Sequence, residues 1–430
     1  MFVAVKKVLI ITYYWPPSGG GGVQRWLKFV KYLGEFGWEP IVYTPENPDF
    51  ELQDKTLLED VPKGLKVLKK PIWEPFSAYR MLFGKKAVQK QGVVSSSSGS
   101  IFNKLAIWIR GNYFIPDARV FWVRYSVNYL SKYLKKNKID AVVTTGPPHS
   151  LHLIGLELKE RLGINWVADF RDPWSEWDVL DQLKLSKRSR SSHLKLEHSV
   201  LTGADLILAT SPSTKSSLLN LGAKNIEVIT NGYDVEANEL QEVSPNKFKV
   251  SHLGLLNKGR NPEVLWKVLD ELALDPEFSN NLEIYLSGTL DDEVIASIKS
   301  CKNLSDCYKH VGYLSHSQVI DTYRESALLL LLVNNTANAT QILPGKIFEY
   351  IVQNKPILAL GKTSSDASEL LKEVGFNHCL EYDDEEGIKV FVLSAYKDFK
   401  NGTLRTPSGN IDKYHRRALT KSLATCLDQL

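Results

Sequence analysis

The sequence predicts an α/β protein with two successive domains, each built on a parallel sheet that helices cover on both faces. Short β-branched and aliphatic runs alternate with amphipathic stretches through the first half of the 430 residues. A polar stretch at 234–246 follows, and the same alternation then begins again. Near-continuous apolar strands separated by helices indicate parallel sheets, because such strands are buried on both faces.

The first repetition of the pattern occupies the N-terminal half. Val, Ile, Leu and Thr dominate the runs that we expect to be strands, and apolar residues recur at helical spacing between them. The expected strands are 8–12, 40–44, 141–144, 166–168, 205–210 and 226–229, and the clearest helices are 23–36 and 150–162.

The second repetition follows the polar stretch, which we interpret as a linker. Its expected strands are 248–253, 282–287, 308–311, 327–333 and 356–360, with helices at 262–272 and 291–300. A serine-rich patch at 95–100 is expected to be a flexible loop within the first domain.

Composition and charge exclude several classes of protein. A formal net charge of +4 leaves no global electrostatic footprint for nucleic acid, so no nucleic-acid partner is expected. The cysteines show no CxxC spacing, which argues against a zinc site and structural disulfides and for a reducing compartment. The longest aliphatic run, 327–333, is too short to cross a bilayer, so we expect a cytoplasmic protein. The four cysteines are Cys301, Cys307, Cys379 and Cys426.

Four consecutive glycines, Gly19, Gly20, Gly21 and Gly22, lie between the first strand and the first helix. Ligands of open parallel sheets gather at the carboxyl ends of strands, where helix N-termini supply free N–H groups. Glycines let the backbone approach a ligand without interference from Cβ. The spacing lacks G-x-G-x-x-G, so it is not the dinucleotide fingerprint. A ligand-facing turn and a merely mobile turn are both open at this point.

The second domain contains a segment with a specific resemblance. Residues 341–361 read QILPGKIFEYIVQNKPILALG, a loop into a helix with a glutamate, then a connector, a proline and an apolar strand. This segment resembles the donor-binding signature of family 4 glycosyltransferases, which have the GT-B fold. The helix start at Gly345, Lys346 and Ile347 would offer N–H groups to a diphosphate. Glu349 would accept hydrogen bonds from the ribose hydroxyls, with a surface glutamate as the alternative.

The resemblance covers nearly the whole chain in the correct order. It includes the glycine turn with its flanking strand and helix, three further segments, and the final helix; these are 204–234, 252–272, 310–333 and 414–430. It implies two Rossmann-like domains that face each other across a cleft: residues 1–235 on the acceptor side and 236–410 for the nucleotide sugar. Residues 411–430 would form a helix that returns to the first domain.

The resemblance also implies the reaction. A family member transfers a sugar, with retention of configuration, from a nucleotide sugar such as a UDP- or GDP-sugar to a saccharide or lipid-linked acceptor. The leaving diphosphate helps to remove the acceptor proton, so charge compensation and positioning matter more than a dedicated base. No cofactor and no metal are expected, and we find no Asp-x-Asp signature. Polysaccharide or glycolipid assembly at the inner face of a membrane is the expected setting.

Two positions depart from the family pattern. Gln341 stands where many members have a glutamate that contacts the transferred sugar, and it cannot supply a negative charge there. Leu255 stands where an arginine is usual, which leaves Lys258 and Arg260 as the cations for the diphosphate. An exposed basic loop is the alternative interpretation of these two cations.

Polar residues follow two central strands of the first domain. His149 matches a family histidine that hydrogen-bonds the donor sugar, with His152 as the second candidate and a core or helix-start histidine as the alternative. The cluster Asp169, Arg171 and Asp172 follows the next strand, where it would orient an acceptor or equally form an internal salt bridge that braces the loop.

Aromatic and basic residues are mixed through 76–124 at near-helical spacing. Such a surface suits the headgroup region of a membrane or a lipid-linked acceptor, giving a peripheral membrane contact. Helices that pack their aromatic residues into the first domain explain the pattern equally well. Two other functions remain in view: a non-catalytic scaffold that binds sugar nucleotides, suggested by Gln341 and Leu255, and a dinucleotide-dependent oxidoreductase, which would require the absent G-x-G-x-x-G turn.

Overall fold

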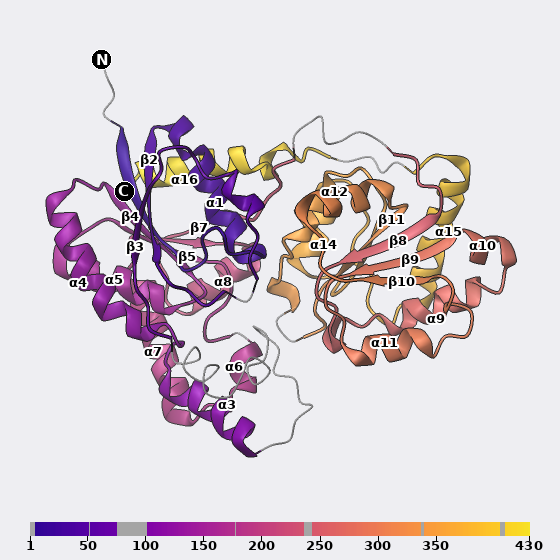
Figure 1. The fold of residues 1–430 in the computed structure, drawn as a ribbon, viewed down its shortest axis with the longest axis horizontal. Coiled ribbons are helices and arrows are strands. Elements are labelled where there is room, and N and C mark those ends of the chain that lie inside the picture. The colour runs from indigo at the N-terminus through magenta and orange to yellow at the C-terminus, as the bar shows by residue number, and fades with distance from the viewer. Residues whose placement is uncertain are drawn as a thin grey trace. The chain divides into compact units, whose positions relative to one another are not determined.

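The computed structural model describes residues 5–50, 52–74, 101–176, 178–235, 243–336, 339–404 and 409–430. The chain divides into two compact units, shown in Figure 1. Unit 1 is Met1–Thr230 with Arg416–Leu430, and unit 2 is Asn231–His415.

Unit 1 is built on a seven-stranded sheet whose strands are all parallel and run in the order β3-β2-β1-β4-β5-β6-β7. The order reverses between β1 and β4, so the chain winds outward in both directions from that point. The strands are β1 (Lys6–Ile11), β2 (Trp38–Pro45), β3 (Lys66–Lys70), β4 (Ala141–Gly146), β5 (Trp166–Phe170), β6 (Leu206–Ala209) and β7 (Ile226–Val228).

Helices cover both faces of this sheet. Strand β1 shows why: Val8 and Ile10 pack into one buried cluster, and the alternate residues Leu9 and Ile11 pack into another on the opposite face. The helices are α1 (Gly21–Leu33), α3 (Ile101–Tyr113), α4 (Val120–Lys136), α5 (Ser150–Leu162), α6 (Asp178–Gln182), α7 (Lys187–Gly203), α8 (Pro212–Asn220) and α16 (Arg416–Asp428).

The last helix, α16, returns to unit 1 as expected. Its Leu423 and Leu427 join the same buried cluster as Trp26 and Leu27 of α1. Lys6 at the start of β1 forms an ion pair of 2.8 Å with Asp428 at the other end of the chain.

Unit 2 has a five-stranded parallel sheet in the order β10-β9-β8-β11-β12, which reverses between β8 and β11. In β11, five consecutive leucines are all buried and alternate between the two cores of the unit. The strands are β8 (Phe248–Leu253), β9 (Leu282–Ser287), β10 (Tyr308–Val311), β11 (Leu328–Leu332) and β12 (Ile357–Leu360). The helices are α9 (Glu263–Leu272), α10 (Pro276–Asn281), α11 (Asp292–Lys299), α12 (His316–Glu325), α13 (Lys346–Ile351), α14 (Asp366–Glu373) and α15 (Glu385–Asn401).

The predicted α/β class with parallel sheets is confirmed. Strand β3, an edge strand that reads KVLKK, was not predicted from the sequence. Edge strands carry lysines because charge discourages pairing with another chain, and the same lysines hide the apolar pattern of a strand. Of the aromatic and basic segment 76–124, residues 76–100 lie outside the described part of the chain.

Among the described residues, no helix has both the length and the hydropathy needed to cross a membrane. All four cysteines are free, and Cys301, Cys307 and Cys379 are buried. Within the same described ranges, no group of three or more His, Cys, Asp or Glu side chains is arranged to hold a metal ion.

Candidate functional site

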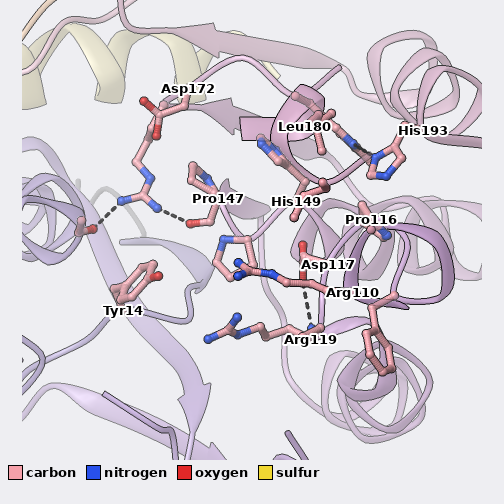
Figure 2. Close-up of a pocket in the computed structure, with 18 of the residues that line it drawn as sticks. Tyr14, Arg110, Pro116, Asp117, Arg119, Pro147, His149, Asp172, Leu180 and His193 are labelled. Carbon is pink, nitrogen blue, oxygen red and sulfur yellow. Dashed lines mark hydrogen bonds between the residues drawn. The ribbon is translucent and has the colours of Figure 1, made fainter. Parts of the chain in front are cut away.

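A pocket of about 370 Å³ lies in unit 1, at the carboxyl ends of β1, β4 and β5 (Figure 2). The strand order reverses between β1 and β4, and open α/β sheets bind ligands at such a switch point. The loops after these three strands form much of its wall, together with residues of α3 and the segment that follows α3. Its lining includes Tyr14, Gly19–Gly22, Arg110, Phe114, Asp117, Arg119, Pro147, His149, Arg171, Asp172, Trp174 and His193.

Three glycines of the turn have different surroundings. Gly20 has φ of +84°, a conformation that L-residues with side chains rarely adopt. A Cβ on Gly19 would lie 2.9 Å from Cγ of Leu52, so that position is crowded. A Cβ on Gly21, where α1 begins, would meet nothing within 4 Å. Gly21 is therefore open to the pocket that it lines.

Arg171 ties the glycine turn to the loop after β4. Its Nη1 donates to the carbonyl of Gly22 at 2.5 Å, its Nε donates to the carbonyl of Gly146 at 3.2 Å, and its Nη2 donates to the carbonyl of Pro147. Its guanidinium also lies over the ring of Tyr14. Arg171 lines the pocket, but its donors are used on backbone carbonyls, so it positions the walls.

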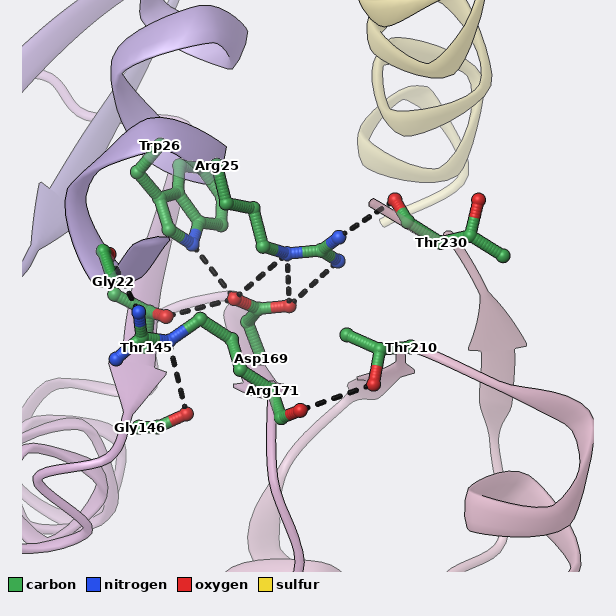
Figure 3. Close-up of polar contacts among 9 residues, drawn as sticks. All are labelled: Gly22, Arg25, Trp26, Thr145, Gly146, Asp169, Arg171, Thr210 and Thr230. Atoms are coloured by element: carbon green, nitrogen blue, oxygen red, sulfur yellow. Dashed lines mark hydrogen bonds and ion pairs between the residues drawn. The ribbon is translucent and has the colours of Figure 1, made fainter. Parts of the chain in front are cut away.

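Asp169 lies behind this wall and not in the pocket (Figure 3). Its buried carboxylate accepts hydrogen bonds from Nη2 of Arg25 at 2.9 Å, from Nε1 of Trp26 at 2.7 Å and from Oγ1 of Thr145 at 2.8 Å. Burial alone would raise the pKa of Asp169, but the charge of Arg25 and these hydrogen bonds outweigh it and hold the pKa below its usual value. Of the two roles considered for Asp169, the structure favours the internal brace over acceptor contact. Asp172 is exposed and lines the pocket.

His149 is the pocket histidine. It precedes α5 directly and is buried, with its ring stacked on Trp174 at a centroid distance of 5.0 Å. Burial lowers its pKa well below the usual value, so the imidazole is neutral at pH 7. Neither ring nitrogen has a hydrogen bond of normal geometry among the described residues, although the backbone of Pro173 lies close enough to act on the ring. His152 is fully buried, and its Nδ1 lies 2.9 Å from Oγ1 of Thr144, outside the pocket lining.

His193, which was not predicted from the sequence, also lines the pocket. Nε1 of Trp174 donates to its Nδ1 at 3.1 Å, so the proton of the neutral ring resides on Nε2. Arg119 was missed as well; it forms an ion pair of 3.0 Å with the buried Glu74. The contact between Trp174 and His193 spans 19 residues of chain and that between Glu74 and Arg119 spans 45, so no local sequence pattern predicts them.

Unit 2 has its own candidate site, again at a switch point of its sheet. Arg260, which follows β8, donates through Nε to the side-chain oxygen of Asn334, which follows β11. The backbone N–H of Asn335 also donates to the carbonyl of Gly259 at 3.0 Å. The loops after the two strands that flank the reversal are thereby joined.

Lys346, the first residue of α13, lies at the same switch point. A Cβ on Gly254, directly after β8, would collide with its Nζ. Burial lowers the pKa of Lys346; the carboxylate of Glu349 opposes this, and the charge of Arg260 adds a smaller lowering. Burial also lowers the pKa of Arg260. Burial and Lys346 lower the pKa of His252, at the end of β8, to about 4. In the part of the chain that the structure describes, no carboxylate forms an ion pair with Lys346 or Arg260.

The other predicted site residues of unit 2 differ in exposure and in contacts. Lys258 is exposed and forms an ion pair of 3.0 Å with Glu293. Glu349 lies in the first turn of α13 and accepts a hydrogen bond of 2.8 Å from the hydroxyl of the buried Tyr323. The side chain of Ile347 is fully buried in the core, so only its backbone is available to a ligand. Gly345 precedes α13 and is exposed, and Gln341 ends a short 3₁₀ turn and is half-buried.

Comparisons with known proteins give one family match and several structural matches. Residues 92–237 match the profile of Glycosyltransferase Family 4. Among solved structures, similarity extends to Anabaena HepE in complex with UDP and glucose, at a TM-score of 0.62 and 15% identity over 99% of this chain and 100% of that one. Sucrose-phosphate synthase of Thermosynechococcus elongatus is similar at a TM-score of 0.61 and 13% identity, over 99% of this chain and 98% of that one. S. aureus TarM, solved as a mutant with UDP and saccharide ligands, is similar at a TM-score of 0.57 and 10% identity, over 98% of this chain and 100% of that one.

A search of curated protein sequences gives no match. At these identities the structural likeness shows the fold, which is GT-B. The family match covers less than half of the chain, and nearly all of it lies in unit 1.

Proposed function

We propose that this chain, a family 4 glycosyltransferase with the GT-B fold, moves a sugar from a UDP- or GDP-sugar to a hydroxyl of a saccharide or lipid-linked acceptor, with retention of configuration. The single observation that carries the proposal is the pair Lys346 and Arg260. Two partly buried cations lie together at the switch point of unit 2, Lys346 beside Gly254 and Arg260 on Asn334. Among the described residues no carboxylate is within ion-pair distance of either, and the charge of Glu349 acts on Lys346 from farther away. Burying like charges together is unfavourable unless an anion joins them, and a diphosphate is such an anion.

The donor would be held by unit 2. Lys346 and Arg260 would bind the diphosphate oxygens, and Glu349 would accept from the ribose hydroxyls with its position fixed by Tyr323. Lys258 is the weakest of the three cation candidates, because its ammonium is exposed and already paired with Glu293.

The chemistry needs charge compensation above all. The bond between the anomeric carbon and the diphosphate oxygen breaks, the acceptor oxygen attacks the same face, and the leaving diphosphate takes the acceptor proton. Negative charge grows on the diphosphate in the transition state, where Lys346 and Arg260 would stabilise it more than in the ground state. His149 would donate to or accept from a hydroxyl of the transferred sugar, since its ring is neutral and lines the pocket. Gln341 would contact the same sugar through its amide.

The acceptor would enter the pocket of unit 1, with Asp172 at its rim and the Gly20–Gly22 turn on its wall. The HepE structure with UDP and glucose and the TarM structure with UDP and saccharides support this assignment of donor and acceptor types by fold. Four free cysteines favour a reducing compartment, in keeping with a cytoplasmic enzyme.

A panel of UDP- and GDP-sugars tests the proposal. The protein should release nucleoside diphosphate from one of them by slow hydrolysis in the absence of acceptor, and Lys346→Met should abolish that release. Tight binding of a nucleotide sugar without any turnover, even with saccharide acceptors present, would instead identify a binding scaffold. Binding of none of the panel would overturn the donor site.

A further inference from the structure

Helix α3 exposes large apolar side chains along one side. Leu105, Trp108, Ile109 and Tyr113 are between 37% and 70% exposed. Their spacing of three, one and four residues places them within one broad stripe of a helix. A solvent-facing helix side in a globular protein is usually polar, so this stripe requires an explanation.

The opposite side of α3 faces the pocket of unit 1. Arg110 and Gly111 of α3 line that pocket, as does Phe114 directly after the helix. The helix therefore separates the candidate acceptor pocket from the apolar stripe, and its two sides have different surroundings.

The C-terminal turn of α3 is firmly held against the segment that leads into α7 (Figure 1). A Cβ on Gly111 would lie 2.8 Å from Cβ of Leu183, so the backbones approach closely. The side-chain oxygen of Asn112 accepts from the N–H of Ser186 and from the hydroxyl of Ser189, both at 2.8 Å. The C-terminal end of α3, which carries Tyr113 of the apolar stripe, thus lies beside the start of α7.

Basic residues dominate the α7 part of this surface. Lys184, Lys187, Arg188 and Lys195 are exposed, and the described residues place no carboxylate within ion-pair distance of any of them. Arg190 is the neighbour that is paired, with Asp181. The surface therefore combines exposed Trp, Tyr, Ile and Leu with a block of positive charge.

We propose that the face formed by α3 and the start of α7 docks on an anionic lipid bilayer. Trp108 and Tyr113 have the amphipathic rings that favour the headgroup level, and the basic block complements anionic headgroups. At about 1.5 Å per residue, the 13 residues of α3 reach about 20 Å, so the helix lies in the interface and does not cross it. Pairing of two copies through this face would bring the two basic blocks together, which like-charge repulsion opposes.

This docking has a consequence for the acceptor, which rests on the proposed function. The pocket and the docked apolar stripe lie on opposite sides of α3, and a helix has a diameter of about 10 Å. A saccharide carried on a membrane-anchored lipid would therefore be presented at the height of the pocket.

Co-sedimentation with vesicles tests the docking. Vesicles of phosphatidylcholine alone and vesicles that also contain phosphatidylglycerol are compared with the wild type, with the double variant Trp108→Ser/Ile109→Ser, and with the double variant Lys187→Glu/Arg188→Glu. The control is Val390→Ser/Leu393→Ser, two comparably exposed apolar residues on α15 of unit 2. The wild type and the control should bind the anionic vesicles, and each variant of the docking face should bind at least about ten-fold more weakly.

Equal vesicle binding by all four proteins, or binding by none, would overturn the proposal. Light scattering that shows a dimer in the wild type and a monomer in Trp108→Ser/Ile109→Ser would assign the face to a second copy instead. Hydrolysis of the donor in the absence of vesicles should be the same in all four proteins. Absence of donor hydrolysis in all four proteins would refute the proposed function but would not change the vesicle result. Failure of the proposed function and failure of the docking proposal are therefore distinguishable.

Discussion

The guanidinium of Arg25 holds the carboxylate of Asp169 inside unit 1, with both side chains almost completely buried (Figure 3). Two nitrogens of Arg25 reach the same oxygen, at 2.9 and 3.1 Å, and Trp26 and Thr145 satisfy the other one. Arg25 also donates to the carbonyl of Thr230 at 2.8 Å. The pair therefore joins α1 to the end of β5 and fixes the helix that begins at the glycine turn.

Substitution of this carboxylate should destabilise unit 1. Asp169→Ala leaves the charge of Arg25 buried and uncompensated, which should lower the free energy of unfolding by about 3–5 kcal/mol. Asp172→Ala is the matched control, because Asp172 is exposed and should change stability by no more than about 0.5 kcal/mol. Denaturant unfolding of both variants measures the difference. A stable Asp169→Ala protein with lost transfer activity would return Asp169 to an acceptor role.

The fold was readable from the sequence because parallel strands are buried on both faces and read as unbroken apolar runs, as Leu328–Leu332 does. The role of Asp169 could not be predicted from the sequence, since an aspartate near a strand end has the same local pattern whether it faces a pocket or an arginine far away in the chain. Partner identity depends on contacts across 144 residues, which no spacing rule reports.

The cations of unit 2 show a similar limit. The sequence indicates that Lys258, Arg260 and Lys346 lie in loops or helix starts near strand ends. It does not indicate which side chain points outward to Glu293 and which lies beside Gly254. The three-dimensional environment separates them, because two are partly buried together and one is exposed.

Lys346 should matter more for turnover than Lys258. Lys346→Ala should lower kcat by about 10²-fold or more, because it removes a cation at the place where leaving-group charge develops. Lys258→Ala should change kcat by less than about five-fold, the scale of an exposed ion pair. Steady-state kinetics with the correct donor measures both. The reverse ranking would place the diphosphate on the outer side of the loop.

Glu349 should contribute to donor affinity. Glu349→Ala should weaken nucleotide-sugar binding by about 1.5–3 kcal/mol, through the loss of a charged hydrogen-bond acceptor. Tyr323→Phe is the control, since it removes only the hydroxyl that positions Glu349 and should have a smaller effect on affinity. Calorimetry measures both constants. Unchanged affinity in Glu349→Ala would exclude the ribose contact.

Stability should fall on acidification below about pH 6.5. Burial lowers the pKa of His152 to about 3, whereas an unfolded histidine titrates at its usual value. Between these two values the unfolded chain takes up a proton that the folded chain does not. Each such histidine therefore removes up to about 1.4 kcal/mol of stability per pH unit as the pH falls.

His152→Gln tests this dependence, since glutamine does not titrate. The readout is the slope of the free energy of unfolding against pH between about 6.5 and 5, and not its absolute value, because the substitution also changes packing. The variant should show a shallower slope than the wild type. Identical slopes would mean that His152 takes up its proton in the folded state.

The glycine turn gives the last prediction, Gly21→Val. A Cβ on Gly21 meets no atom within 4 Å and the residue lies on the pocket wall, so the new side chain would occupy space meant for a ligand. Stability should change only modestly, while transfer should fall strongly and donor affinity, which belongs to unit 2 in our proposal, should fall less. Gly34→Val is the matched control, because Gly34 is also exposed and also has nothing within 4 Å of a built Cβ, but it lies outside the pocket. Melting temperature, donor affinity and turnover are measured on both. If Gly21→Val retains normal turnover, the four glycines serve only to turn the chain between β1 and α1.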